Sequence, residues 1–290
     1  MFKKIVIFLQ MIKFEHTVFA LPFAFMAALL GSVAIHQELP SWAQIGWVLL
    51  AMIGARSAAM GLNRLIDRVS DAKNPRTANR AIPKGLLKIG EVVVFVIASF
   101  ALLFWAAAEL DPLALKLLPI AVIMLVFYSY TKRFTWLCHV VLGLTIALAP
   151  LGGWAAVTGQ VDWTAMVFFA TITFWIAGFD IIYACQDVEF DTKEGLHSIP
   201  VRFGVAKSLK IAQAFHMITA LGFIALLLMT DLGWWYVAGM VIAYIILFYE
   251  HHIVSPSDLS RLQTAFFTMN GVLSIVVFSF TLIDLVVRHN

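Results

Sequence analysis

The sequence is poor in charged residues and in cysteine, and both shortages exclude classes of protein. Only 13% of its 290 residues are charged and 62% are hydrophobic, whereas soluble domains carry about 25% charged residues. A soluble fold could not cover that much apolar surface with polar groups. The two cysteines, Cys138 and Cys185, cannot form a disulfide framework or a cysteine-rich metal cluster, so we expect free thiols. The composition therefore predicts a polytopic membrane protein.

The chain contains nine apolar segments, and a bilayer crossing needs roughly 20 apolar residues per helix. The first segment leads directly into the others, so we expect it to be a span and not a targeting signal. Several segments begin at a tryptophan, a residue that favours the headgroup level of a membrane. The nine predicted spans are Thr17–Ile35, Trp42–Leu62, Glu91–Ala108, Leu113–Tyr130, Trp136–Val157, Trp163–Ala184, Leu209–Thr230, Trp234–Tyr249 and Ala265–Val287.

Basic residues are distributed very unevenly between the two sides of these spans. With the N-terminus in the cytoplasm, 17 of the 20 Lys and Arg residues fall on the cytoplasmic side and two on the other, while Arg56 lies within a span. Cytoplasmic loops of membrane proteins carry just such an excess. We therefore expect a protein of the cell membrane with a cytoplasmic N-terminus. The two long polar connections, 63–90 and 185–208, are then cytoplasmic too.

Acidic residues recur at a spacing of four where two spans end. The second span ends in Asn63, Asp67 and Asp71, and the sixth in Asp187 and Asp191. A step of four residues returns to nearly the same face of a helix. Each span end thus presents a stripe of carboxylates on the same side of the membrane.

Clustered carboxylates repel one another unless cations lie between them, and their oxygens suit Mg²⁺, which usually adds phosphate oxygens from a substrate. Basic residues surround both stripes. This combination in a lipid setting indicates a metal-bound pyrophosphate on an apolar tail. A single Asp pair near a helix end is common and would indicate little. A transporter could use carboxylates as an ion relay, but these tend to lie singly and in mid-span.

At these residues the sequence resembles the UbiA superfamily of intramembrane aromatic prenyltransferases. The family's first motif is N-D-x-x-D-x-x-x-D, or more loosely N-x-x-x-D-x-x-x-D, and its second is D-x-x-x-D, preceded by Asp and Tyr on the same helix. Segments 127–134 (FYSYTKRF) and 195–204 (GLHSIPVRFG) also resemble family segments, so the resemblance covers nearly the whole chain. Arg64 stands where the strict motif has Asp, which leaves open how many ions the first stripe holds.

The resemblance implies an all-α fold, with about nine transmembrane helices around a central cavity, in one domain over residues 1–290. It also implies Mg²⁺-dependent transfer of a polyprenyl chain from polyprenyl pyrophosphate to an aromatic acceptor. Asn63 would bind the pyrophosphate or orient a carboxylate. The residues implied to hold Mg²⁺ and to act in catalysis are Asp67, Asp71, Asp187 and Asp191.

Other residues are candidate substrate contacts. Arg133 matches a family position suited to the carboxylate of the acceptor, because a planar guanidinium pairs with it through two hydrogen bonds. Asp180 and Tyr183 could shield the allylic cation or orient the acceptor. The candidate pyrophosphate contacts are Lys13, Arg68, Lys73 and Lys132.

The identity of the acceptor stays open at this point. Arg64 together with segment 74–80 (NPRTANR) resembles a subgroup of 4-hydroxybenzoate polyprenyltransferases, part of which serves menaquinone synthesis through a dihydroxynaphthoate. We therefore expect a hydroxylated aromatic carboxylate in ubiquinone or menaquinone biosynthesis. The rivals are a sister enzyme acting on haem, a chlorophyll precursor or a glycerol phosphate, and a transporter without chemistry. The lipid bilayer is an expected partner and nucleic acid is not.

Two further polar groups lie in or beside the spans. Arg56 lies about two turns before Asn63, so it faces either the same polar cavity or only its packing neighbours. Glu250, His251 and His252 end the eighth span, where interfacial polar residues explain them at least as well as a metal site.

Overall fold

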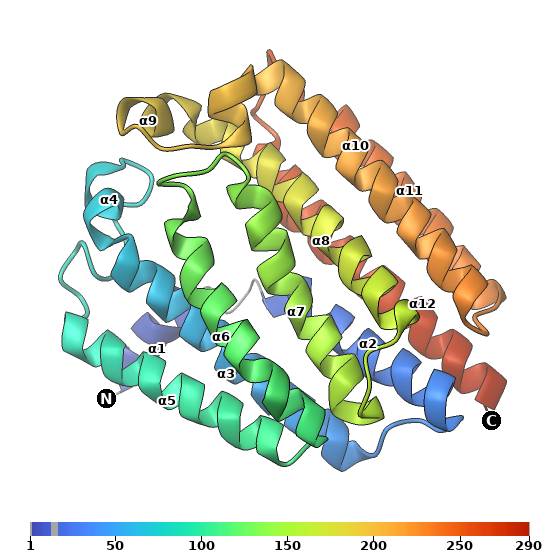
Figure 1. Ribbon diagram of the computed structural model, residues 1–290. Helices are drawn as coiled ribbons and strands as arrows, with labels where there is room; N and C mark the ends of the chain where they lie inside the picture. Colours follow the sequence, from blue (N-terminus) through green and yellow to red (C-terminus); the bar gives the residue numbers. More distant parts are fainter. Residues whose placement is uncertain (1, 13–16, 290) are drawn as a thin grey trace.

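A computed structural model describes residues 2–12 and 17–289, and this part of the chain is helical, without a strand. Nine helices of 19 residues or more form a bundle among the residues described (Figure 1). They are α2 (Thr17–His36), α3 (Trp42–Ile66), α5 (Ile89–Ala108), α6 (Pro112–Thr131), α7 (Cys138–Thr158), α8 (Trp163–Ala184), α10 (Ile199–Met229), α11 (Trp234–His252) and α12 (Asn270–His289).

Shorter elements lie at the ends of these helices. A 3₁₀ turn, η2 (Cys185–Asp187), links α8 to α9, and a π-helix, η3 (Thr264–Met269), precedes α12. The short helices are α1 (Phe2–Met11), α4 (Arg68–Lys73) and α9 (Val188–Lys193).

Seven helical segments of the described chain are long and apolar enough to cross a membrane. They contain α3, α5, α6, α7, α8, α10 and α12. The chain is therefore an integral membrane protein, as its composition predicts. Helices α2 and α11 are not among the seven, so the expected number of nine spans stays a prediction.

Helix α10 begins ten residues before the predicted seventh span, at Ile199 in place of Leu209. Ser198 caps it by accepting a hydrogen bond from the amide of Val201, and Pro200 lies in its first turn, where its missing N–H costs nothing. The helix bends at Gly204, whose φ of 75° lies in the region that favours glycine. The connection after the second acidic stripe is therefore largely helical.

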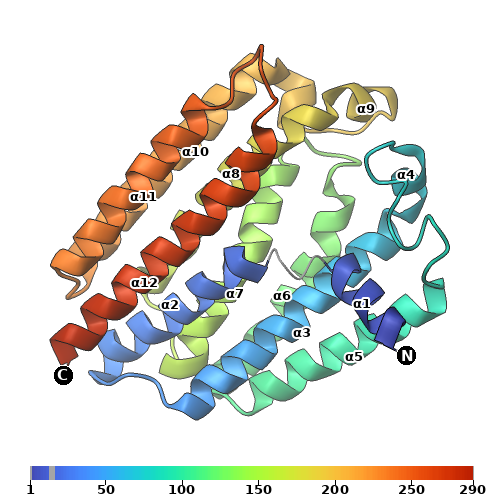
Figure 2. The ribbon, with the colours of Figure 1, turned by 180° about the vertical axis from the view of Figure 1, so that it is seen from behind.

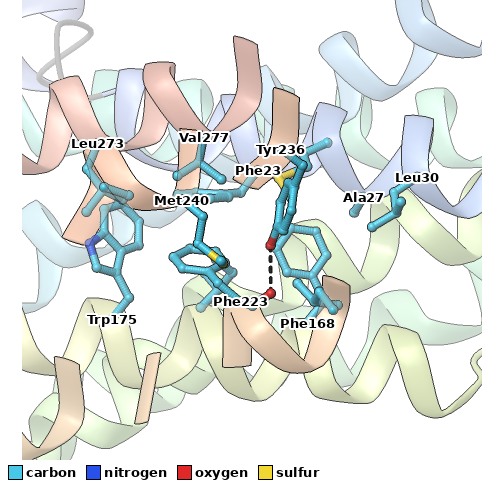
Figure 3. Close-up of a cluster of buried hydrophobic side chains, with 14 of the residues drawn as sticks. Phe23, Ala27, Leu30, Phe168, Trp175, Phe223, Tyr236, Met240, Leu273 and Val277 are labelled. Carbon is cyan, nitrogen blue, oxygen red and sulfur yellow. Dashed lines mark hydrogen bonds between the residues drawn. The ribbon is translucent and has the colours of Figure 1, made fainter. Parts of the chain in front are cut away.

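The interior of the bundle is packed with aromatic side chains where α2, α8, α10 and α11 meet (Figure 3). Phe23 contacts Trp175 edge to face, with 4.9 Å between ring centroids. The buried hydroxyl of Tyr236 donates to the carbonyl of Phe223 at 3.0 Å. A hydroxyl in such an apolar place needs this partner, because leaving it unpaired costs free energy.

Helix α7 lies at the centre of the bundle and approaches its neighbours through glycines. A Cβ atom on Gly143 would lie 2.3 Å from the carbonyl oxygen of Thr173 on α8, and one on Gly153 would lie 2.6 Å from that of Ala24 on α2. Only glycine allows backbones to come this close, which is a common means of helix packing in membranes.

This architecture brings the two acidic stripes together. Helices α3 and α8 end at the same end of the bundle, and the short helices α4 and α9 follow them there (Figures 1 and 2). Lys73 of α4 and Glu194, which follows α9, form an ion pair of 2.7 Å between the two segments.

Candidate active site

The first stripe lies at a break in the helix. Helix α3 ends at Ile66 and α4 begins at Arg68, so Asp67 lies between them with φ −90° and ψ 4°. Hydrogen bonds of the helical i to i+4 type still cross the break, from the amide of Asp67 to Asn63 and from that of Asp71 to Asp67. The side chain of Asn63 donates to Asp67 at 2.8 Å. Asn63 thus orients this carboxylate.

The second stripe repeats the same local geometry. Asp187 is the last residue of η2 and precedes α9, and its φ of −98° and ψ of 2° are nearly those of Asp67. This region of the φ/ψ map is sparsely populated and is common at active sites. In both stripes the break falls at the first aspartate, and in both the second aspartate is almost fully buried: Asp71 is 6% exposed and Asp191 2%.

Each of the four carboxylates contacts a cationic side chain of the protein. Arg80 binds Asp71 at 2.6 Å, Lys132 binds Asp191 at 3.0 Å, and Arg133 lies 3.6 Å from Asp67. Arg76 holds Asp187 through two hydrogen bonds, of 3.0 Å from Nε and 2.8 Å from Nη2. The four basic residues neutralise charge that would otherwise drive the two stripes apart.

Arg76 joins the two stripes. It follows the first stripe in the chain, binds the first aspartate of the second, and places Nη1 3.4 Å from the hydroxyl of Tyr183. Neither Arg76 nor Arg80 was among the expected contacts. The signal was present, because both belong to segment 74–80 that carries part of the family resemblance, but a basic loop does not reveal which carboxylate each residue meets.

The expected substrate contacts fall into two groups. Lys132 and Arg133 contact the stripes directly. Arg133 also donates to the carbonyl of Ile66 and lies over the ring of Tyr130. By contrast, Arg68 donates to the carbonyl of Leu65, and Lys73 pairs with Glu194, so both lie at the exposed edge of the site. Lys13 lies outside the described residues.

The charges of the site alter its protonation equilibria. Burial and the nearby Asp71 raise the pKa of Asp67 above its usual value. For Lys132, burial lowers the pKa, but the carboxylate of Asp191 more than offsets this and leaves it raised. The pKa of Arg76 is raised in the same way, against burial, by Asp187. Arg76 and Lys132 therefore stay charged, and a cation bound beside Asp67 would favour its ionised form.

A cavity of about 970 Å³ opens beside the stripes and extends into the bundle. Its lining comes mainly from α3, α6, α7, α8 and the segment 76–86, with further residues from α1, α5 and η3. Away from the stripes it is lined by small and aliphatic residues, among them Ala51, Leu103 and Ala156. The polar residues that line it are Gln10, Arg56, Asn63, Arg64, Arg76, Thr77, Asn79, Arg80, Tyr128, Thr145, Asp180, Tyr183 and Gln263.

Aromatic side chains form one wall of the cavity near the stripes. Phe266 stacks on Tyr183, with 4.0 Å between ring centroids and 28° between ring planes. Phe266 lies in the π-helix η3, and the side chain of Asn270 donates to the carbonyls of Ala265 and Phe266 in that element. Buried Glu250 accepts a further hydrogen bond from Asn270 at 3.0 Å. Glu250 thus supports a structural network and stands apart from the acidic stripes.

The carboxylates suit a magnesium ion by their chemistry. All four offer oxygen ligands, and the buried Oδ2 of Asp71 has no hydrogen-bond partner. Within the described chain no three Asp, Glu, His or Cys residues come together as one ligand group. Mg²⁺ usually takes one or two carboxylates and completes its coordination with water and substrate phosphates, so two separate pairs meet that requirement.

Comparisons with known proteins agree with this geometry. Residues 24–272 match the model of the UbiA prenyltransferase family. The chain is 29% identical over 245 residues to the 4-hydroxybenzoate octaprenyltransferase of Vibrio campbellii, covering 83% of this chain and 84% of the relative. It is 30% identical to the enzyme of that description from Aromatoleum aromaticum, covering 82% and 80%.

The fold matches solved structures of the same family. A UbiA homologue from Aeropyrum pernix superposes with a TM-score of 0.84 at 29% identity, over 93% of this chain and 98% of that one. A UbiA homologue from Archaeoglobus fulgidus, bound to DMAPP and Mg²⁺, superposes with a TM-score of 0.76 at 22% identity, over 97% and 99%. With the family model matched over most of its length, the chain belongs to the UbiA prenyltransferase family.

Proposed function

We propose that this protein transfers a polyprenyl chain from polyprenyl pyrophosphate to 4-hydroxybenzoate, with loss of pyrophosphate, in the synthesis of ubiquinone. The observation that carries the proposal is the meeting of two acidic stripes beside the mouth of a mainly apolar cavity, where Asn63, Arg76 and Arg80 both line the cavity and contact the stripes. The mouth suits a metal-bound pyrophosphate, and the apolar interior suits an isoprenoid tail, which has no reason to enter water.

In this proposal Asp67, Asp71, Asp187 and Asp191 would hold Mg²⁺ for the pyrophosphate. The ion supplies charge neutralisation for the leaving group. The number of ions remains open, because Arg64 replaces one potential ligand and instead donates to Asn63 at 3.2 Å.

The basic residues of the mouth have a second role in the proposal. Arg76, Arg80 and Lys132 hold the carboxylates in place and lie where the pyrophosphate would enter. These cations would also be able to contact the phosphate oxygens of the substrate, which are anionic like the carboxylates. Such preorganised charge stabilises a leaving group as it departs.

The carboxylate of the acceptor needs a cationic partner, and the cavity offers Arg56. This arginine lies in α3, seven residues or about 10 Å before Asn63, and lines the cavity. An ionisable residue within a span usually has a functional role. Arg133, the candidate from the sequence, contacts Asp67 and Tyr130 and is not among the described residues that line the cavity. We therefore favour Arg56 and keep Arg133 as the alternative.

The relatives favour 4-hydroxybenzoate over a dihydroxynaphthoate, since those named above are 4-hydroxybenzoate octaprenyltransferases. The asymmetry of basic residues supports nine spans, with the mouth of the cavity facing the cytoplasm. This orientation gives the site access to a soluble pyrophosphate head and a soluble acceptor.

An acceptor panel tests the proposal. Protein purified in detergent is mixed with Mg²⁺, geranyl pyrophosphate and either 4-hydroxybenzoate or 1,4-dihydroxy-2-naphthoate, and the products are identified by mass spectrometry. We expect a product whose mass is that of 4-hydroxybenzoate with one hydrogen replaced by a geranyl group. Product from the naphthoate alone would identify the dihydroxynaphthoate as the acceptor in place of 4-hydroxybenzoate. If the protein binds geranyl pyrophosphate but forms no product from either acceptor, a sister enzyme with another acceptor or a carrier would be favoured.

A further inference from the structure

Asp180 has no part in the acidic stripes, yet it lines the cavity beside them. It lies in α8, seven residues or about 10 Å before Asp187, and its side chain is 21% exposed. Among the described residues that line the cavity, it is the one acidic side chain. A carboxylate inside a membrane-spanning helix is costly and calls for a function.

Asp180 is held by a histidine from the neighbouring helix. His139, in the first turn of α7, places Nδ1 2.7 Å from Oδ2 of Asp180 and is completely buried. Because an ionised carboxylate can only accept a hydrogen bond, Nδ1 of His139 carries the proton and donates it. This bond fixes the orientation of the carboxylate and leaves Oδ1 available to accept a proton.

The surroundings of Asp180 match the place where an aromatic acceptor must react. Tyr183 lies one turn later on the same face of α8 and stacks on Phe266, and Arg76 links its hydroxyl to Asp187. A pyrophosphate at the stripes therefore places its allylic carbon against this wall, between the stripes and Asp180. The other carboxylates of the site are paired with Arg or Lys and are needed for the metal.

We propose that Asp180 is the general base that removes the ring proton of the acceptor and that His139 is its positioning residue; this rests on the function proposed above. The allylic carbon–oxygen bond breaks and the pyrophosphate leaves with the electron pair. A ring carbon next to the hydroxyl group forms the new carbon–carbon bond with a pair of ring electrons. The carbon–hydrogen bond at that carbon then breaks, its electrons restore the aromatic ring, and Oδ1 of Asp180 takes the proton, which passes to solvent before the next turnover.

The test compares acceptors with and without deuterium at the two ring positions next to the hydroxyl. With wild-type protein we expect kcat to differ little between them, because an unhindered base makes proton removal fast. Asp180→Asn keeps the shape and loses the base. It should lower kcat by about 10²-fold or more, leave the acceptor KM within about threefold, and slow the deuterated acceptor at least twofold relative to the protiated one.

Variants of His139 separate positioning from packing. His139→Leu should lower kcat by about tenfold and also produce a deuterium effect, whereas His139→Gln, which keeps an N–H donor, should recover most of the rate. Glu38→Gln, an exposed carboxylate, serves as control and should behave as wild type. A wild-type kcat in Asp180→Asn, or a lowered kcat without a deuterium effect, would overturn the assignment. Wild-type protein that makes no prenylated acceptor would instead refute the proposed function, and with it the roles of Asp180 and His139.

Discussion

Arg76→Ala should make the metal-free protein less stable and more dependent on Mg²⁺. The substitution leaves Asp187, whose side chain is 9% exposed, without the two hydrogen bonds that Arg76 supplies. Hydrogen bonds to charged groups contribute roughly 1.5–3 kcal/mol. Because the Arg76 side chain is 35% exposed, solvent screening reduces this to about 1–2 kcal/mol. The unfolding midpoint should therefore fall by roughly 2–8 °C.

The assay is thermal unfolding in detergent, followed by tryptophan fluorescence, first with a chelator and then with Mg²⁺ and inorganic pyrophosphate. A divalent ion can replace the lost cation at Asp187, so the ligands should raise the midpoint of Arg76→Ala more than that of the wild type. Lys193→Ala removes an exposed ion pair with Glu189 and should change neither value. Equal midpoints and equal ligand shifts for Arg76→Ala and wild type would refute the account of Arg76 as the cation that stands in for the metal.

Three further predictions concern other parts of the molecule. Arg56→Ala should raise the KM of the aromatic acceptor about tenfold or more, because a charge-assisted pair is lost. Arg133→Ala should leave this KM unchanged, and the reverse result would restore Arg133 as the acceptor contact. Glu250→Ala should lower the unfolding midpoint more than Glu250→Gln, which keeps a carbonyl oxygen for Asn270, and equal losses would argue against this hydrogen bond as the cause. A cysteine in place of Lys84 should resist an impermeant thiol reagent in intact cells, because its loop is expected in the cytoplasm, and should react after permeabilisation. The two native cysteines are buried and should give little background labelling. Labelling of the new cysteine in intact cells would show that the topology is inverted.

Local spacing predicted the acidic stripes, since a step of four residues keeps side chains on one helix face wherever the helix lies. It did not predict that each first aspartate lies at a helix break. Helical hydrogen bonds continue across the break at Asp67, so the residue pattern of a continuous helix and that of a helix broken at this point are the same. The membrane character and the positions of most spans followed from hydropathy alone, because the cost of exposing apolar residues to water depends little on the fold.

Long-range pairing was beyond the sequence. Arg76 meets Asp187 across 111 residues, and Lys132 meets Asp191 across 59. Every Lys or Arg that the charge bias predicts to be cytoplasmic satisfies that bias equally, so the bias cannot select among them. His139 gave no signal as the partner of Asp180, because a single histidine in an apolar helix is more often a packing residue. The π-helix that carries Phe266 has no characteristic residue type either.

The most direct test of the central claim is the turnover of single variants of the four motif carboxylates. Asp67→Asn, Asp71→Asn, Asp187→Asn and Asp191→Asn are each assayed with polyprenyl pyrophosphate, 4-hydroxybenzoate and Mg²⁺, and the wild type is also assayed with a chelator. If both stripes hold one metal-bound pyrophosphate, each variant should lose about 10²-fold or more in kcat, and chelation should abolish wild-type turnover until Mg²⁺ is restored. Full activity of the variants of either stripe, or wild-type turnover in metal-free buffer, would contradict the account.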